Sequence, residues 1–121
     1  MGFQSLMAYQ LAYRLAMDVF EKSKAFPRAE AFSMTDQIRR ASRSVCANLA
    51  EGYRKRQYPK HFLSKLSNAD AEASEVLVFL DFARDCGYLN EDSHKTLMAD
   101  YQRLGQMLGM MMQNPRKFFP K

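Results

Sequence analysis

The chain has 121 residues, 47% of them hydrophobic, and a formal net charge of +5 at pH 7. Five glycines and four prolines are too few for a collagen-like or disordered chain, and the length suits a single domain covering residues 1–121. Two cysteines and two histidines provide neither a disulfide framework nor a zinc-binding spacing.

The sequence predicts a soluble cytoplasmic protein. The first twenty residues include Arg14 and Asp18 and lack the apolar core of a secretory signal. No run of about eighteen apolar residues could span a membrane. We expect Cys46 and Cys86 to be buried free thiols in a reducing compartment.

Apolar residues recur every three or four positions and predict helices along most of the chain. The first helix is expected over residues 4–24 and ends before Phe26-Pro27, because the residue before a proline avoids helical geometry. The second is expected over residues 35–56, with Ser33 or Thr35 as its cap. Its apolar stripe comprises Ile38, Ala41, Val45, Leu49 and Tyr53.

The third helix is expected over residues 59–86, with Pro59 in its first turn and Gly87 at its end. Phe79 and Phe82 lie off its main stripe, which predicts a second buried side. A fourth helix over residues 91–113 follows Asn90, and a short basic tail occupies residues 115–121.

Four amphipathic helices with short connections predict an all-α, antiparallel up-and-down four-helix bundle. Apolar side chains outside the main stripes exceed what one small bundle can bury, which favours self-association. They include a group of methionines on the last helix and two phenylalanines in the tail: Met107, Met110, Met111, Met112, Phe118 and Phe119.

The sequence offers no catalytic set, so we expect no enzyme activity, no cofactor and no metal site. It contains no nucleophile-elbow, phosphate-loop or zinc-protease motif. Glu72 and Glu75 resemble half of a di-iron site, but no matching Glu-x-x-His motif lies in the core. Glu91 and His94 have that spacing in a helical first turn that we expect to be exposed.

Charge is arranged in blocks along the chain. Residues 37–65 carry eight bases and one acid, whereas residues 66–100 carry eight acids and two bases. On a helical wheel, Arg39, Arg40, Arg43 and Arg54 lie opposite the apolar stripe of the second helix. Such a face suits contact with a phosphate backbone. The predicted nucleic-acid-binding residues are Arg39, Arg40, Arg43, Arg54, Lys55, Arg56 and Lys60, with Tyr58 and His61 available for stacking.

A polar sector lies beside the apolar stripe of the second helix. It comprises Gln37, Ser44, Asn48 and Glu51. Polar groups so close to a core need partners, which we expect on a neighbouring helix or a neighbouring subunit.

The basic face permits two interpretations. It could bind nucleic acid, RNA before DNA, or it could pair with the acids of the third helix, within one bundle or between subunits. The second interpretation makes the protein a structural or adaptor module, which binds itself or a protein partner and no nucleic acid. It predicts that Arg39→Glu and Arg43→Glu break the oligomer.

One stretch of the second helix resembles a known family. Residues 33–41 read Ser-Met-Thr-Asp-Gln-Ile-Arg-Arg-Ala, and residues 44–52 read Ser-Val-Cys-Ala-Asn-Leu-Ala-Glu-Gly. With Gly87-Tyr88-Leu89 later in the chain, they resemble the bacterial four-helix bundle proteins, also called ribosomal RNA intervening-sequence proteins. The resemblance covers roughly residues 3–112. Residues 71–74, Ala-Glu-Ala-Ser, replace a Gly-Ser pair found in many members and indicate a subfamily.

The resemblance implies a closed bundle that assembles as a homopentamer with a central channel. Some members are encoded inside insertions of large-subunit ribosomal RNA genes. A similar barrel serves diversity-generating retroelements as an accessory protein, which binds nucleic acid and a reverse transcriptase.

Overall fold

The computed structural model describes residues 2–120; Met1 and Lys121, the last residue of the predicted basic tail, lie outside them. Within this range the chain forms four α-helices: α1 (Met7–Ser23), α2 (Met34–Arg54), α3 (Pro59–Asp85) and α4 (Glu91–Gln113). Three short 3-10 helices accompany them: η1 (Phe3–Ser5), η2 (Arg28–Glu30) and η3 (Pro115–Phe118). The described residues contain no strand, which confirms the all-α class.

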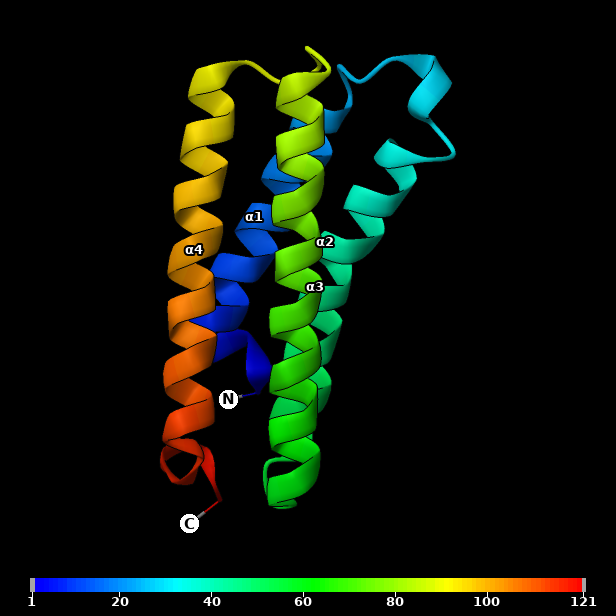
Figure 1. Cartoon of the computed structure of the whole chain (residues 1–121). Coiled ribbons are helices and arrows are strands. Elements are labelled where there is room, and N and C mark those ends of the chain that lie inside the picture. Colours follow the sequence, from blue (N-terminus) through cyan, green and yellow to red (C-terminus); the bar gives the residue numbers. More distant parts are fainter. Residues whose placement is uncertain (1, 121) are drawn as a thin grey trace.

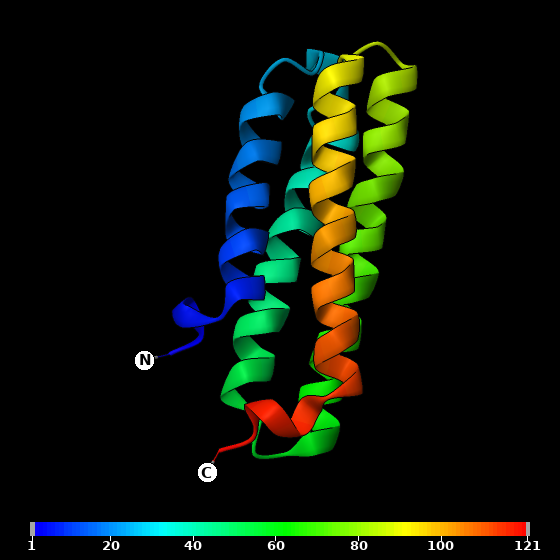
Figure 2. The same ribbon diagram turned by 90° about the vertical axis from the view of Figure 1, so that its left-hand side faces the viewer.

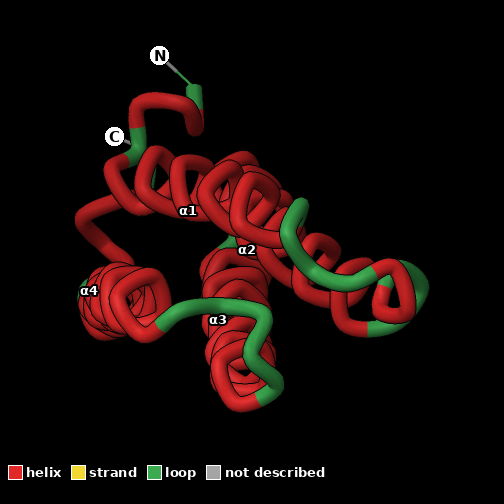
Figure 3. Tube along the Cα trace, turned by 90° about the horizontal axis from the view of Figure 1, so that it is seen from above, coloured by secondary structure: helices red, strands yellow, loops and turns green. Residues whose placement is uncertain are grey.

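The four helices run alternately up and down (Figure 1). α2 packs against α1 and α3, and α4 packs against α3 and α1. Seen from above, η2 and the start of α2 lean away from the other helices (Figure 3). None of the helices in residues 2–120 is long and apolar enough to span a membrane.

Each long helix contributes one apolar stripe to a common core. Leu15, Val45, Leu66 and Leu104, one from each helix, have no solvent-exposed surface. Burying a side chain of this size stabilises the folded chain by about 1.5–3 kcal/mol. The heptad-like spacing of these stripes therefore determines which face of each helix turns inward.

Local signals determine where several helices begin and end. Pro59 occupies the first turn of α3, and the Asn90 side chain caps α4 by accepting the Ser93 N–H at 2.7 Å. Gly87 ends the α3 region with φ of 79°, a left-handed conformation that favours glycine. α2, α3 and α4 begin and end within two residues of the predicted limits.

The first helix begins later than predicted. η1 covers residues 3–5, and an extended Leu6 separates it from α1, which begins at Met7. Ser33, one of the two predicted caps, occupies the N-cap position of α2, but its side chain makes no capping bond, because its hydroxyl donates to Glu30 Oε1 at 2.6 Å. The second Glu30 oxygen accepts from the Tyr88 hydroxyl at 3.0 Å, so η2 is tied to the α3–α4 turn.

Two predictions of burial are wrong. Phe79 does pack against the core from a half-buried position, but Phe82 is 55% exposed. Cys46 is half-buried, whereas Cys86 at the end of α3 is exposed. Phe82 near the end of α3 and Cys86 at its C-cap thus lie where neighbouring helices do not cover them.

Candidate nucleic-acid interface

The outer face of α2 presents basic side chains along most of its length. Arg40, Arg43 and Arg54 are exposed, as are Lys55 just after α2 and Lys60 in the first turn of α3. Fourteen residues separate Arg40 from Arg54 along the chain, which corresponds to about 21 Å of helix. The predicted residues thus form an extended strip rather than one compact cluster.

Arg39 is held against α1 rather than presented to solvent. Its Nε donates to Ser23 Oγ at 2.7 Å, and its guanidinium lies 4.7 Å from the centre of the Phe20 ring. The side chain is half-buried and Ser23 is buried. Arg39 therefore joins α2 to α1, and the prediction that it shares one open face with Arg40 is wrong. Arg43 lies further out, 5.9 Å from the same ring, and remains exposed.

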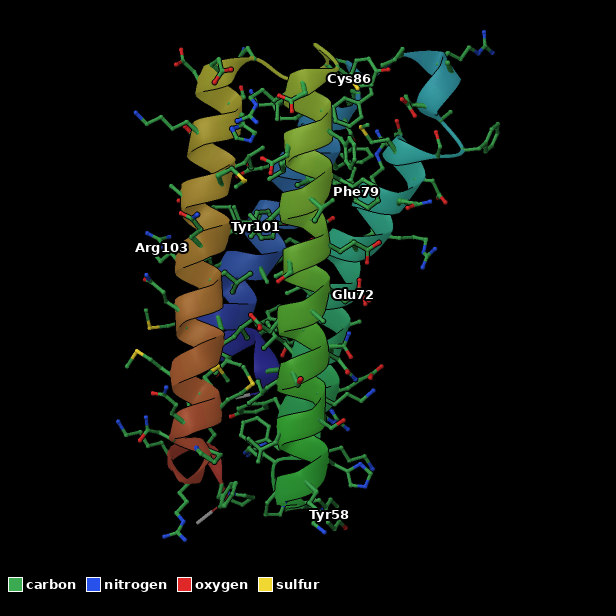
Figure 4. The ribbon with its side chains drawn as sticks, in the orientation of Figure 1. Tyr58, Glu72, Phe79, Cys86, Tyr101 and Arg103 are labelled. Carbon is green, nitrogen blue, oxygen red and sulfur yellow. The ribbon has the colours of Figure 1, made fainter. Side chains whose placement is uncertain are left out.

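Arg40 lies on the opposite edge of the strip, near the acids of α3. The pKa of Glu72 is raised, chiefly because the carboxyl is partly buried and because Glu75 is close, and the Arg40 charge offsets part of this rise. Figure 4 shows Glu72 and Phe79 on the α3 side that faces α2. The α2–α3 ion pair in the described chain joins Lys65 Nζ to Glu51 Oε2 at 2.7 Å, so within residues 2–120 the α2 arginines are not neutralised by direct contact with α3.

The remaining predicted bases gather at the α2–α3 turn. Arg56 is half-buried: its Nη1 donates to the Tyr53 carbonyl at 2.9 Å, and its guanidinium lies 4.0 Å from the centre of the Tyr53 ring. Lys55 Nζ lies 5.9 Å from the centre of the Tyr58 ring. Arg56, in the turn, is therefore held against the end of α2, whereas Arg54, Lys55 and Lys60 present their charges to solvent.

The residues of the polar sector of α2 are satisfied in three different ways. Asn48 Nδ2 donates to the Ser44 carbonyl at 2.9 Å and to Ser44 Oγ at 3.1 Å, within the same helix. Glu51 pairs with Lys65 of α3, as expected for a neighbouring helix. Gln37 is exposed. The sector therefore borders the α2–α3 contact and forms no cluster aimed at a ligand.

Two further bases reach this end of the molecule through the tail. η3 turns back under the bundle, so Arg116 and Lys117 lie at the same end as the α2–α3 turn (Figure 2). The rings of Phe118 and Phe119 hold it there, 6.1 and 6.5 Å from the Phe62 ring. The sequence predicts a basic tail, but its two phenylalanines, interpreted there as surface for self-association, dock the tail on Phe62 instead.

An apolar pocket of about 440 Å³ lies beside the tail. η1, the first turn of α1 and the end of α4 form its walls, with Tyr53 from α2 and Lys117 and Phe118 from η3. Lys117 is the one charged residue in this lining. The pocket therefore holds no pair of groups for acid–base or nucleophilic chemistry.

His94 forms a structural contact between two helices. His94, which we expected to be exposed, is only 7% exposed, and its Nε2 lies 2.8 Å from Asp81 Oδ1, joining α4 to α3. Within residues 2–120, no three side chains of the His, Cys, Asp and Glu types gather to hold a metal ion.

The structure defines an all-α four-helix bundle with an exposed basic strip on α2. The chain is a member of the 23S rRNA-intervening sequence protein family, whose model matches residues 4–110. Among curated proteins none matches the chain.

A solved structure supports the fold. A protein of unknown function from the S23 ribosomal protein family of Bacteroides thetaiotaomicron superposes with a TM-score of 0.81 at 21% identity. The match covers 88% of this chain and 96% of that one. At this identity the likeness shows a shared fold.

Proposed function

We propose that the protein is a non-catalytic, oligomeric helical bundle of the cytoplasm that binds RNA through the basic strip of α2 and the α2–α3 turn. One observation carries the proposal: Arg40, Arg43, Arg54, Lys55 and Lys60 are exposed, while Glu51, the one acid among residues 37–65, is paired with Lys65. The name of the family refers to 23S rRNA, which favours RNA over DNA as the polyanion.

Binding of this kind depends on phosphate contacts and therefore on salt. Each contact to a single strand changes the slope of log affinity against log salt by about −0.7. Five contacts would lower the affinity about a hundredfold between 50 and 200 mM salt. Filter binding or fluorescence anisotropy across this range, with a short unstructured RNA, measures the slope.

Charge reversal on the strip locates the site. Arg40→Glu with Arg43→Glu should lower the affinity for RNA at least tenfold and make the salt slope shallower. Arg28→Glu with Arg103→Glu is the matched control, because both side chains are exposed and lie on η2 and α4. Figure 4 shows Arg103 on the side of α4 away from α2. Equal losses in the two double variants would contradict a site on α2.

The adaptor interpretation makes the opposite prediction for the same variants. If the α2 bases pair with acids of another subunit, Arg40→Glu with Arg43→Glu should lower the mass of the assembly measured by light scattering. Arg39 is unsuitable for this test, because its contacts with Ser23 and Phe20 stabilise the protomer itself. An intact assembly that has lost RNA binding supports the RNA proposal.

The resemblance implies that five copies assemble, and we include a homopentamer in the proposal. Exposed apolar side chains on the protomer support self-association. Val78 and Phe82 on α3 are 51% and 55% exposed. Covering such side chains in an assembly is favourable.

A further inference from the structure

The end of the bundle formed by the α2–α3 turn and the tail is far more basic than the opposite end. Residues 51–65 carry five bases and one acid, and the described tail adds Arg116 and Lys117. At the other end, residues 81–95 carry four acids and two bases. The molecule therefore has a strong positive pole where three separate segments meet, which we call the basic end: residues 54–56, 58–61 and 115–118 (Figure 2).

An exposed aromatic ring stands within the basic end. Tyr58 is 51% exposed, and Figure 4 shows it at the extreme end of α3. The His61 ring meets it edge-on at a centroid distance of 6.2 Å, and Lys55 Nζ lies 5.9 Å from its centre. An accessible ring beside cations is the combination that proteins use to stack an unpaired base while holding its phosphates.

Main-chain hydrogen bonds alone hold the backbone of Tyr58 in place. The Tyr58 N–H donates to the Lys55 carbonyl at 2.8 Å, and its carbonyl accepts the Phe62 N–H at 3.0 Å. Because these bonds are made by main-chain atoms, replacing the ring leaves them intact. The ring is therefore presented on a fixed turn, which lowers the entropy cost of binding a partner.

The tail is anchored to the same end by the core. Phe62 is fully buried, and Phe118 and Phe119 pack against it. Arg116 and Lys117 precede these two rings directly, so their charges cannot move far from the α2–α3 turn. The tail thus adds fixed positive charge to the basic end.

We propose that the basic end binds a single-stranded segment of RNA, with one base stacked on Tyr58 and phosphates held by Lys55, Lys60, Arg116 and Lys117. The proposal rests on the RNA-binding function above and specifies the form of RNA. In an A-form duplex the bases are already stacked, and the deep, narrow major groove excludes side chains. Tyr58 therefore adds affinity for unpaired bases and none for a duplex.

The experiment uses fluorescence anisotropy with the full chain, an unstructured RNA of about 20 nucleotides and the duplex formed with its complement. Tyr58→Ala should weaken single-strand binding about tenfold and leave duplex binding unchanged. Tyr58→Phe keeps the stacking ring and should bind like the parent. Tyr13→Ala is the matched control, since Tyr13 on α1 is 54% exposed and lies away from the basic end.

Two further variants complete the test. Tyr58→Leu keeps apolar volume without an aromatic face, so it should bind as weakly as Tyr58→Ala even if the alanine variant is unstable. Arg116→Ala with Lys117→Ala should reduce the steepness of the single-strand salt slope by about 1.4, or 0.7 for each lost phosphate contact. Lys22→Ala with Lys95→Ala, exposed bases near the opposite end, should leave the slope unchanged.

The outcomes separate this inference from the proposed function. If all Tyr58 variants bind single strands like the parent and binding stays salt-dependent, base stacking at Tyr58 is overturned and RNA binding by the α2 strip stands. Equal weakening of single-strand and duplex binding in Tyr58→Leu overturns the preference for unpaired bases. Absence of salt-dependent binding to either RNA overturns both proposals.

Discussion

Burial gives the two cysteines different chemistry. Burial raises the pKa of the Cys46 thiol to about 11, so at pH 8 about one molecule in a thousand carries the reactive thiolate there. Cys86 is exposed at the end of α3. We therefore expect iodoacetamide at pH 8 to alkylate Cys86 first and Cys46 at least about tenfold more slowly. Mass spectrometry of the peptides measures both rates.

A control variant isolates the slow thiol. In Cys86→Ser the remaining reaction should be slow at pH 8 and should accelerate about tenfold per pH unit, because the thiolate fraction rises until pH approaches the pKa. Equal alkylation rates for the two cysteines at pH 8 would show that Cys46 is more accessible than its half-buried position indicates.

Tyr101 carries a buried hydroxyl that lowers the stability of the folded chain. The side chain is 1% exposed, and its hydroxyl has no hydrogen-bond partner among the described residues. Tyr101→Phe removes this group and should raise the free energy of unfolding by about 1 kcal/mol. Urea denaturation at pH 7 measures the change. Tyr88→Phe provides the contrast, because it loses the hydrogen bond to Glu30 and should lower stability slightly.

Tyr101 should also make the free energy of unfolding depend on pH in the alkaline range. Burial raises the pKa of Tyr101 above its ordinary value of 10.0. Above about pH 10 the unfolded chain therefore releases this proton before the folded chain does, and stability falls as pH rises. The advantage of Tyr101→Phe over the parent should accordingly grow above pH 10, and a constant difference would contradict a raised pKa.

At the scale of the helices, two helical glycines with different surroundings should respond oppositely to alanine. A Cβ at Gly52 of α2 would lie 3.0 Å from Lys65 Cβ and 3.7 Å from Phe62 Cδ1, whereas a Cβ at Gly109 of α4 meets nothing within 4 Å. Alanine favours either helix by about 1 kcal/mol. Overpacking at Gly52 costs about 1–3 kcal/mol, so Gly52→Ala should destabilise and Gly109→Ala should stabilise by about 0.5–1 kcal/mol.

Thermal unfolding followed by circular dichroism compares the two variants directly. Stabilisation by both alanines would mean that α2 and α3 can move apart at Gly52 without loss. Because Lys65 also pairs with Glu51 one residue before Gly52, displacement of its stem should weaken that ion pair as well.

Most helix limits could be predicted because their signals are local, while contacts between helices could not. Pro59, Gly87 and Asn90 act through their own turn, so one stretch of sequence reveals them. Arg39 shares a wheel sector with Arg43, yet its side chain bonds to Ser23 at the end of α1. A helical wheel describes one helix and carries no information about where the next one crosses it.

At the scale of the whole molecule, features within one segment could again be predicted, whereas contacts between distant segments could not. The charge blocks could be read from the sequence, but the basic end depends on the tail returning beneath the bundle, which brings Arg116 from the far end of the chain to the α2–α3 turn. The docking residues Phe118 and Phe119 read as surplus apolar surface in the sequence; in the structure they cover Phe62.

The exposed apolar side chains of α3 predict where copies would meet in the proposed assembly. Ala71, Val78 and Phe82 lie seven and four residues apart on α3, so they follow one side of the helix, and all three are exposed. If this side is covered in an assembly, Val78→Glu with Phe82→Glu places two charges in an apolar contact, which is strongly unfavourable. Light scattering should then give a mass closer to the 14.0 kDa of one chain, with unchanged helix content by circular dichroism.

Tyr13→Glu with Met17→Glu is the matched control on α1, because these two side chains are exposed to a similar extent. We expect it to leave the assembly mass unchanged. If the α1 pair dissociates the assembly and the α3 pair does not, the contact between copies lies on α1. In that case the outer side of α3 stays open beside the α2 strip, and its acids, Glu75 among them, would face solvent next to any bound RNA.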